Sequence, residues 1–422
     1  MYSMRLCLKS FFIIFLISCQ TAENSDAHNI VKDSVGEQQK EKREPLKDNP
    51  SSYKLVCGAE RLDKLKELIG HRNIGLIANQ TSRVGQTHLV DTLLSRGEKI
   101  QAVFAPEHGF RGKQDAGAHV QSGKDERTGL PIISLYGSNK KPTEEQLEGI
   151  ELVVFDIQDV GARFYTYIST LHYVMEACAE NDIPLIVLDR PNPNGHYVDG
   201  PVLQPEYKSF VGMHPIPIVH GMTIGELAKM INDEGWLNNG LKCELRILKM
   251  SGYEHAMAYS LPVAPSPNLR SDVAIQLYPT LCLFEGTVLS VGRGTDRPFE
   301  MFGHPGLKVN EKYDYTFIPT PGFGSQQPKL KGEKCYGLDL GASNSDAKLN
   351  QINLTWIIDA QQTMKSKQID MITRENWFDK LAGTNELRKQ LRSGVSAEEI
   401  RSSWQPELDE FRKLRKRYLL YP

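Results

Sequence analysis

From about residue 53 onward, short apolar runs of strand length alternate with amphipathic stretches of helical length. Five runs are predicted as strands, at 73–80, 100–109, 130–137, 152–159 and 183–193. Helices are predicted at 88–97, 143–150, with Thr143 as its N-cap, 170–181 and 223–235. Apolar strands that alternate with helices indicate a parallel sheet that is covered on both faces. The predicted fold class is therefore α/β, with a Rossmann-like parallel-sheet domain.

The folded part is predicted to contain two domains, because about 370 residues exceed what one compact core usually holds. Residues 53–262 are assigned to the Rossmann-like α/β domain. The proline-rich stretch "LPVAPSPNLR" at 261–270 marks the crossing into a second, smaller α+β domain at 263–422.

The first fifty residues are predicted to direct export. Residues 1–19 combine basic side chains with the apolar run "FFIIFLIS", which is too short to span a bilayer as a stable helix, and end in "LISC". This ending has the form of a lipoprotein cleavage site, with Cys19 as the lipidated residue. The alternative is an ordinary secretory signal in which Cys19 is incidental. Residues 20–52 are polar and charged, which predicts a disordered tether.

On this interpretation the protein is anchored by lipid in the cell envelope and touches the membrane through that anchor only. The net charge of −2 and the dispersed basic residues argue against nucleic-acid binding. The five cysteines after Cys19 are widely spaced and form no CxxC pair, so a thiolate zinc site is not expected and at most one or two disulfides could form. Nothing in the sequence indicates an oligomeric state.

Several classes of site lack their motifs. The stretch "ANQTSRVG" after the first strand is not a dinucleotide fingerprint, and there is no P-loop, so no cofactor is expected. The eleven histidines are scattered, which disfavours a metal site, and the G-x-S-x-G motif of serine hydrolases is absent.

Polar side chains follow the apolar runs, where ligands bind in open parallel sheets. They are Asn79 after the first run, Glu107, His108 and Arg111 after the second, Asp156, Gln158, Arg163, Tyr165 and Tyr167 after the fourth, and Asn192 after the fifth. Amides and carboxylates pair with hydroxyl groups, aromatic rings stack on sugars, and arginine binds anionic substituents. The set therefore predicts a polar sugar-binding cleft.

Two carboxyl groups could serve as the acid and its partner in glycoside cleavage. Glu107 is the first candidate. Glu285, in "LFEGT", is the second, and the alternative for it is a structural salt bridge to Arg293 or Arg297. Asp156 and Asp189 compete with Glu285 for the second role.

Six stretches together resemble the exo-β-N-acetylmuramidase family of bacterial peptidoglycan hydrolases, long described as a domain of unknown function. They are "GLIANQTS", "FAPEHGFRG", "FDIQDVGARFYTYI", "LDRPNPNG", "PSPNL" and "FEGTVLSVGRGTDRPFE". The resemblance covers the chain from about residue 55 to its end. It implies release of terminal N-acetylmuramic acid from peptidoglycan-derived glycans, in a cleft between a Rossmann-like domain and a smaller one.

The resemblance also implies roles for residues in these stretches. Glu107 becomes the general acid, and Glu285 the second catalytic group, which a tyrosine such as Tyr165 or the substrate's acetamido group could replace. Arg163 and Arg293 are expected to bind the lactyl carboxylate of muramic acid. Asn268 in "PSPNL" and Thr295 in "VGRGT" join the expected substrate-binding residues, and Val291 stands where an acidic residue is expected.

Two other functions stay open at this point. A non-catalytic lipoprotein could use the same cleft to capture muropeptides, and an amidase or esterase could act on the same material. The amidase or esterase would need a nucleophile or metal that the sequence does not reveal.

Overall fold

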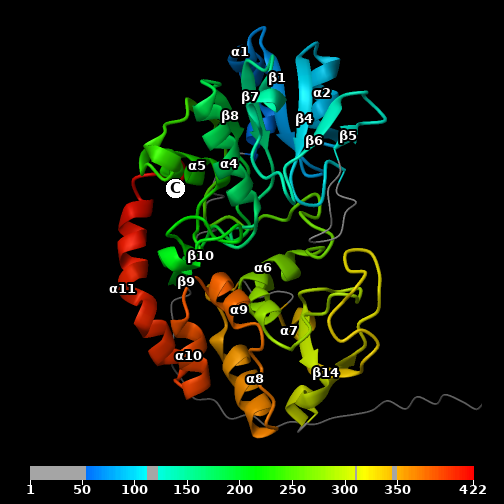
Figure 1. Ribbon diagram of the computed structural model, residues 1–422, viewed down its shortest axis with the longest axis vertical. Helices are drawn as coiled ribbons and strands as arrows, with labels where there is room; N and C mark the ends of the chain where they lie inside the picture. The colour runs from blue at the N-terminus through cyan, green and yellow to red at the C-terminus, as the bar shows by residue number, and fades with distance from the viewer. Residues whose placement is uncertain (1–53, 112–121, 309–310, 345–348) are drawn as a thin grey trace, which may run out of the picture. The chain divides into compact units, whose positions relative to one another are not determined.

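The computed structural model describes residues 54–111, 122–308, 311–344 and 349–422 (Figure 1). The predicted signal peptide at 1–19, its lipidation site Cys19 and the predicted tether at 20–52 lie outside these residues. In the part of the chain that is described, no helix combines the length and the apolar character needed to cross a membrane.

The larger domain is built on a sheet with the strand order β11-β8-β7-β1-β4-β6-β5. Its strands are β1 (Asn73–Ala78), β4 (Lys99–Ala105), β5 (Gly123–Lys124), β6 (Pro131–Ser134), β7 (Leu152–Asp156), β8 (Leu185–Leu188) and β11 (Leu245–Leu248). The described strands of this sheet pair in parallel, except for the antiparallel edge strand β5. From β1 the chain builds β4 and β6 on one side, then β7, β8 and β11 on the other. This is the doubly wound, Rossmann-like order.

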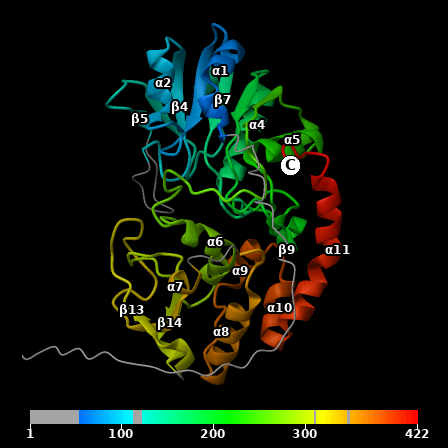
Figure 2. The same ribbon diagram turned by 180° about the vertical axis from the view of Figure 1, so that it is seen from behind.

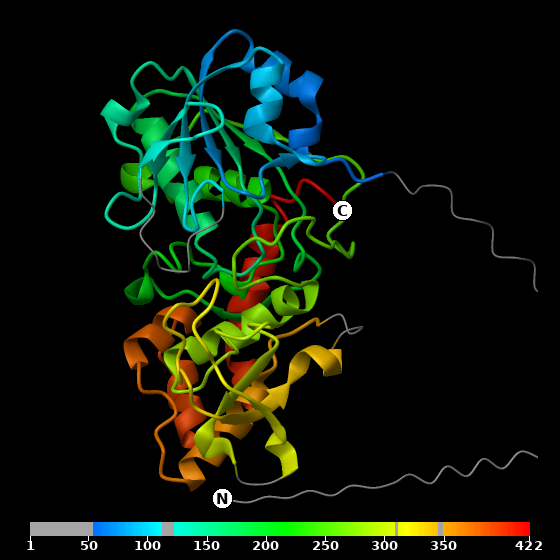
Figure 3. The same ribbon diagram turned by 90° about the vertical axis from the view of Figure 1, so that its right-hand side faces the viewer.

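Helices cover both faces of this sheet (Figure 3). They are α1 (Leu62–Ile69), α2 (Leu89–Ser95), α3 (Glu144–Leu147), α4 (Tyr167–Glu180) and α5 (Ile224–Asp233). Alternate residues of β7 enter different cores: Leu152 and Val154 pack with apolar residues of α1 and α2, whereas Val153 and Phe155 pack with those of α4 and α5. The predicted burial of the sheet on both faces is confirmed.

The second, smaller domain combines an antiparallel sheet, in the order β12-β14-β13, with helices. Its elements are α6 (Asp272–Leu281), the 3₁₀ helix η4 (Cys282–Gly286), β12 (Met301–His304), β13 (Tyr315–Phe317), β14 (Cys335–Asp339), α7 (Leu340–Asn344), α8 (Leu354–Ser366), α9 (Glu375–Ala382), α10 (Glu386–Ser393) and α11 (Ala397–Arg415). This mixture agrees with the predicted α+β character.

Short elements complete the described chain. They are the antiparallel pairs β2 (Arg83–Val84) with β3 (Thr87–His88) and β9 (Asp199–Val202) with β10 (Pro217–Val219), and the 3₁₀ helices η1 (Gly58–Glu60), η2 (Pro205–Tyr207), η3 (Asn238–Gly240), η5 (Pro305–Leu307) and η6 (Glu311–Tyr313). The predicted N-cap Thr143 is confirmed, because its side chain accepts a hydrogen bond from the backbone N–H of Gln146. The helix α1 and the strand β11 were not predicted from the sequence. The strand β11 is a short edge strand whose partly exposed pattern is not a continuous apolar run.

After α11 the chain returns to the larger domain (Figures 1 and 2). The Tyr421 hydroxyl donates a hydrogen bond to Asp189 at the end of β8, at 2.6 Å, and the backbone N–H of His255 donates to the Pro422 carbonyl, at 2.9 Å. The last residues of the segment predicted as the second domain therefore pack against the first, and the described chain from residue 54 onward belongs to one compact unit.

Candidate active site

A cavity of about 930 Å³ brings together segments that are far apart in the sequence. One part of its wall comes from the larger domain and consists of Glu107, His108, Tyr136, Phe164 to Tyr167 and Ser209 to Val211. The rest comes mainly from α6, η4, the loops around 290 and 325, and α9. Seven of the predicted site residues line this pocket: Glu107, His108, Tyr165, Tyr167, Asn268, Glu285 and Arg293.

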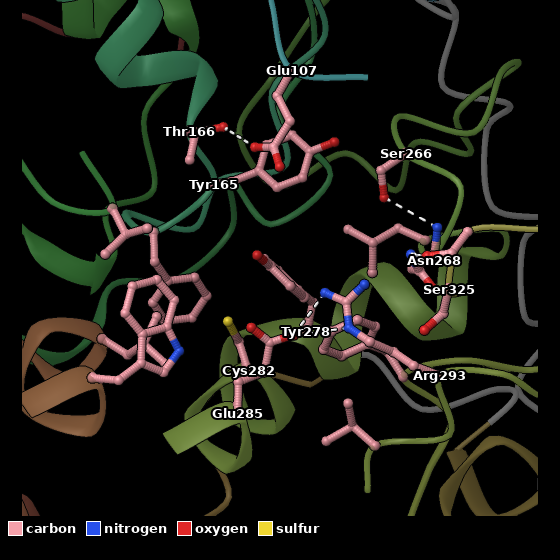
Figure 4. A pocket seen from close by; sticks show the side chains of 18 of the residues that line it. Glu107, Tyr165, Thr166, Ser266, Asn268, Tyr278, Cys282, Glu285, Arg293 and Ser325 are labelled. Carbon is pink, nitrogen blue, oxygen red and sulfur yellow. Dashed lines mark hydrogen bonds and ion pairs between the residues drawn. The ribbon is translucent and has the colours of Figure 1, made fainter. Parts of the chain in front are cut away.

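Glu107 lies on a sharp turn directly after β4. The turn is made by His108 and Gly109, whose φ angles of 72° and 75° are in the left-handed region. The Glu107 carboxylate points into the pocket, and the Thr166 hydroxyl donates a hydrogen bond to its Oε2 at 2.8 Å (Figure 4). Burial, and then the charge of Glu107 and a hydrogen bond to it, raise the pKa of Tyr136. Tyr136 is therefore a neutral phenol beside this carboxylate.

Tyr165 and Tyr167 lie in the segment between β7 and α4, and their rings meet edge to face with centroids 4.8 Å apart. The Tyr167 hydroxyl accepts a hydrogen bond from the Asn79 amide, at 2.9 Å, and lies 3.4 Å from the backbone oxygen of Glu107. Burial raises the pKa of both phenols. Neutral phenols favour a hydrogen-bonding or packing role over nucleophilic attack by Tyr165.

Glu285 enters the same pocket from η4, on the other side from Glu107 (Figure 4). Arg293 holds its carboxylate, because Nε and Nη2 both donate to Oε1, at 2.9 and 2.6 Å. Arg297 pairs instead with Asp339. The salt bridge that was the structural alternative for Glu285 therefore exists, and the paired carboxylate lines the pocket as well.

Asn268 and the loop around Gly324 form another part of the wall. The Asn268 Nδ2 donates to the Gly324 carbonyl at 2.7 Å, and Ser325 next to it faces the pocket (Figure 4). Gly324 has a φ of 91°, and a Cβ there would meet Pro267 and Asn268 at 3.0–3.2 Å. The amide of Asn268 thus fixes the loop that borders the cavity.

Arg163 does not reach the pocket, which corrects its expected role as a carboxylate clamp. Its side chain is buried, and its guanidinium donates to four backbone carbonyls, those of Pro201, Ile216, Leu381 and Ala382. The distances are 2.7 to 3.0 Å. Arg163 therefore joins β9 and the residue before β10 to the end of α9 and has a structural function.

Six other expected substrate-binding residues also lie outside the pocket lining. Each forms a hydrogen bond or an ion pair with another residue of the protein. Asp156 pairs with Arg190, Arg111 with Asp125, Asn79 with Thr81 and Tyr167, Gln158 with the Asp159 and Pro191 carbonyls, Asn192 with the Met222 carbonyl, and Thr295 with the Gly292 carbonyl. Strand ends need such turns and caps. Direct substrate contact by these six is therefore not supported by the geometry.

Asp189, the other competitor for the second carboxylate, is also buried away from the pocket. It accepts hydrogen bonds from the Thr223 and Tyr421 hydroxyls, at 2.8 and 2.6 Å, and from the backbone N–H of Gly225, at 2.8 Å. Glu107 and Glu285 are the described carboxylates that line the cavity.

Several pocket residues were missed by the sequence analysis. They are Tyr136, Thr166, Lys329, Arg374, Trp377 and Lys380. Tyr136 follows β6, so the strand-end rule applied to the third run could have found it. Lys329 and Arg374 come from loops of the smaller domain, and no local motif marks them.

No group of three or more histidine, cysteine, aspartate or glutamate side chains that could hold a metal occurs in the described ranges. The five cysteines of this part, Cys57, Cys178, Cys243, Cys282 and Cys335, are buried and free. The wall of the pocket offers carboxylates, cations, amides and aromatic rings, a set suited to a sugar with an acidic substituent.

The carboxyl group of Asp159 is buried, and burial changes its pKa. Its Oδ2 accepts a hydrogen bond from Gly161 at 2.7 Å, and Nε2 of the buried His220 lies 3.8 Å away. Burial raises the pKa of Asp159 to about 7 and lowers that of His220 to about 3. Asp159 is thus protonated in the folded protein at pH values at which the unfolded chain has already released this proton.

We expect Asp159→Asn to remove a pH-dependent loss of stability. Below about pH 4 Asp159 is protonated in both the folded and the unfolded state. As the pH rises from about 4 to 7, only the unfolded state releases this proton, so the free energy of unfolding of the wild type falls. Above about pH 7 the folded state releases it too, and the free energy of unfolding falls no further. Relative to the wild type, the variant should gain about 4 kcal/mol of unfolding free energy between pH 4 and pH 8. Denaturant unfolding at both pH values measures this gain. An equal difference between the two proteins at both pH values would contradict the assignment.

Comparison with known proteins identifies the family. The N-terminal model of the exo-β-N-acetylmuramidase NamZ matches residues 74–273, and the C-terminal model matches residues 276–421. The chain is 41% identical over 390 residues to the peptidoglycan β-N-acetylmuramidase NamZ of Bacillus subtilis (strain 168), covering 87% of this chain and 92% of that protein.

Two crystal structures of DUF1343 family proteins from Bacteroides fragilis are also similar. One has a TM-score of 0.78 and 41% identity, the other a TM-score of 0.73 and 30% identity, and both comparisons cover 87% of this chain and 99% of the other chain. The resemblance that the six sequence stretches indicated is therefore confirmed at the level of the family. The chain belongs to the exo-β-N-acetylmuramidase NamZ family, and it is a glycosidase.

Proposed function

We propose that the protein removes terminal N-acetylmuramic acid from the non-reducing end of peptidoglycan-derived glycans, and that the pocket described above is its active site. The observation that carries this proposal is the pair of carboxylates, Glu107 and Glu285, that enter one cavity from different domains (Figure 4). Glycoside cleavage needs two such groups on the two sides of the scissile bond. Similarity to the B. subtilis peptidoglycan β-N-acetylmuramidase NamZ supports the muramic acid specificity.

Glu107 serves as the general acid in this proposal. It lies in a half-buried position, and the Thr166 hydroxyl fixes the direction of its carboxyl group. A carboxyl group so placed can give its proton to the glycosidic oxygen as the bond to the anomeric carbon breaks. Thr166 and Tyr136 keep the group oriented while it does so.

Glu285 acts from the opposite side. Arg293 fixes its carboxylate with two hydrogen bonds to one oxygen, which leaves the second oxygen, Oε2, without a bond from Arg293. A negative carboxylate at this position can stabilise the positive charge that develops at the anomeric carbon, and can attack it or activate water. Tyr165, whose phenol is neutral, contributes packing to the pocket wall.

The proposal also places the protein in the cell envelope, attached to a membrane by lipid. The sequence "LISC" before residue 20 supports export and attachment through a lipid on Cys19. An enzyme tethered in the cell envelope would act where peptidoglycan and its fragments are found. Labelling growing cells with a clickable fatty acid tests this directly: the wild type should carry the label, and Cys19→Ala should not.

Product analysis tests the exo mode. Glycan chains that begin with N-acetylmuramic acid at the non-reducing end should release this monosaccharide first, whereas chains capped there by N-acetylglucosamine should resist. Mass spectrometry of samples taken at short times distinguishes the two outcomes. Early appearance of internal fragments would show an endo-acting enzyme, and no release from either chain would contradict the proposal.

A further inference from the structure

Four cationic side chains line the pocket: Arg293, Lys329, Arg374 and Lys380. Arg293 is neutralised by Glu285. Among the described residues, none of Lys329, Arg374 and Lys380 forms an ion pair with a carboxylate. The pocket thus holds more positive than negative charge on the side of the smaller domain.

Lys329 is held at the base of this region. Its Nζ donates to the backbone carbonyls of Thr287 and Phe284, the latter at 3.3 Å, which lie on either side of Glu285 in the chain. An ammonium group has three donors, so one remains for a ligand. Burial is the main cause that lowers the pKa of Lys329 to about 8; the charge of Glu285 opposes this shift, and the like charges of Arg374 and Arg293 add to it. A bound anion would relieve this repulsion.

Arg374 precedes α9 directly, and its charge acts on the Lys329 ammonium group. Its backbone N–H donates to the carbonyl of Gly286 at 3.2 Å, which connects the start of α9 to the end of η4. Its guanidinium lies 5.6 Å from the centre of the Trp377 ring, which is a cation–π contact, and both residues line the pocket. A guanidinium and an ammonium that line one cavity can together bind a carboxylate.

We propose that Lys329 and Arg374 bind the lactyl carboxylate of the terminal muramic acid and so distinguish this sugar from N-acetylglucosamine. The identity of the ligand rests on the proposed function, whereas the excess of cations follows from the residues that line the pocket. The proposal assigns to these residues the role that the sequence analysis gave to Arg163 and Arg293. Arg163 lies outside the pocket, and the charge of Arg293 is already balanced by Glu285.

Binding measurements test the proposal without relying on catalysis. Isothermal titration calorimetry compares N-acetylmuramic acid, its lactyl methyl amide and N-acetylglucosamine on the wild type, Lys329→Met and Arg374→Gln. Each substitution should weaken binding of the free acid by about tenfold or more, because a hydrogen bond to a charged group is lost. Binding of the amide and of N-acetylglucosamine should change little. Lys331→Met, which changes an exposed lysine two residues from Lys329, serves as the matched control.

Several results would overturn the proposal. These are equal binding of the acid and the amide by the wild type, equal weakening of all three ligands in the variants, unchanged binding in both variants, or no binding of muramic acid at all. A wild type that binds the free acid selectively through these residues but hydrolyses no muraminide would refute the proposed function and leave this inference standing. Circular dichroism of each variant confirms that it is folded.

Discussion

Glu107→Gln is expected to lower kcat for a muramic acid disaccharide by a factor of about 10² to 10⁴, because glutamine cannot give a proton to the leaving oxygen. The amide keeps the shape of the side chain and can still meet the Thr166 hydroxyl, so the fold should be preserved. The leaving group provides the decisive comparison. An aryl muraminide with a strongly acidic phenol needs little protonation, and on that substrate the loss should be much smaller.

A matched control comes from Glu126→Gln, which changes an exposed glutamate that does not line the pocket. It should retain the wild-type rate on both substrates. Initial rates with the disaccharide and the aryl glycoside, measured for the wild type and the two variants, complete the test. An equal loss on both substrates for Glu107→Gln would show that Glu107 is not the acid, and full activity would remove it from the mechanism.

Arg190→Met is expected to destabilise the folded protein by about 3 to 5 kcal/mol, because it leaves the carboxylate of Asp156 buried without its partner. Asp156 has no exposed surface. Arg190 binds it with two hydrogen bonds, from Nε to Oδ1 at 2.6 Å and from Nη2 to Oδ2 at 2.9 Å. Urea denaturation with a spectroscopic readout gives the unfolding free energy.

The double variant Asp156→Leu, Arg190→Met should recover most of the stability lost in the single variant, because neither charge is then buried alone. Folded molecules of either variant should retain most of the specific activity, since Asp156 lies outside the pocket lining. A change below about 1 kcal/mol in Arg190→Met, against the 3 to 5 kcal/mol expected for a broken buried pair, would contradict this account of Asp156.

The sequence was most informative where the periodicity of the chain determines the structure. Buried parallel strands must be apolar on both faces, so β1, β4, β7 and β8 stood out, and β6 stood out because it lies in the apolar run at 130–137. The edge strand β11 did not, because its exposed face breaks the apolar run. The same rule placed Glu107 at a strand end that faces the pocket.

The rule could not tell substrate contacts from structural ones. Arg163 follows β7 like a ligand-binding residue, yet four backbone carbonyls, two of them more than 200 residues away in the chain, converge on it. Lys329 and Arg374 face the pocket because the loops and helices of the smaller domain fold around η4. Contacts between residues so far apart in the chain depend on tertiary packing, and no local sequence pattern predicts them.

Whether the protein is a muramidase is decided by hydrolysis of 4-nitrophenyl N-acetyl-β-muraminide by the purified protein, with the corresponding N-acetylglucosaminide as the comparison. Release of nitrophenol is followed by absorbance. We expect rapid cleavage of the muraminide and a far lower kcat/KM for the glucosaminide. A folded protein that cleaves neither substrate, or that cleaves both equally well, would contradict this expectation.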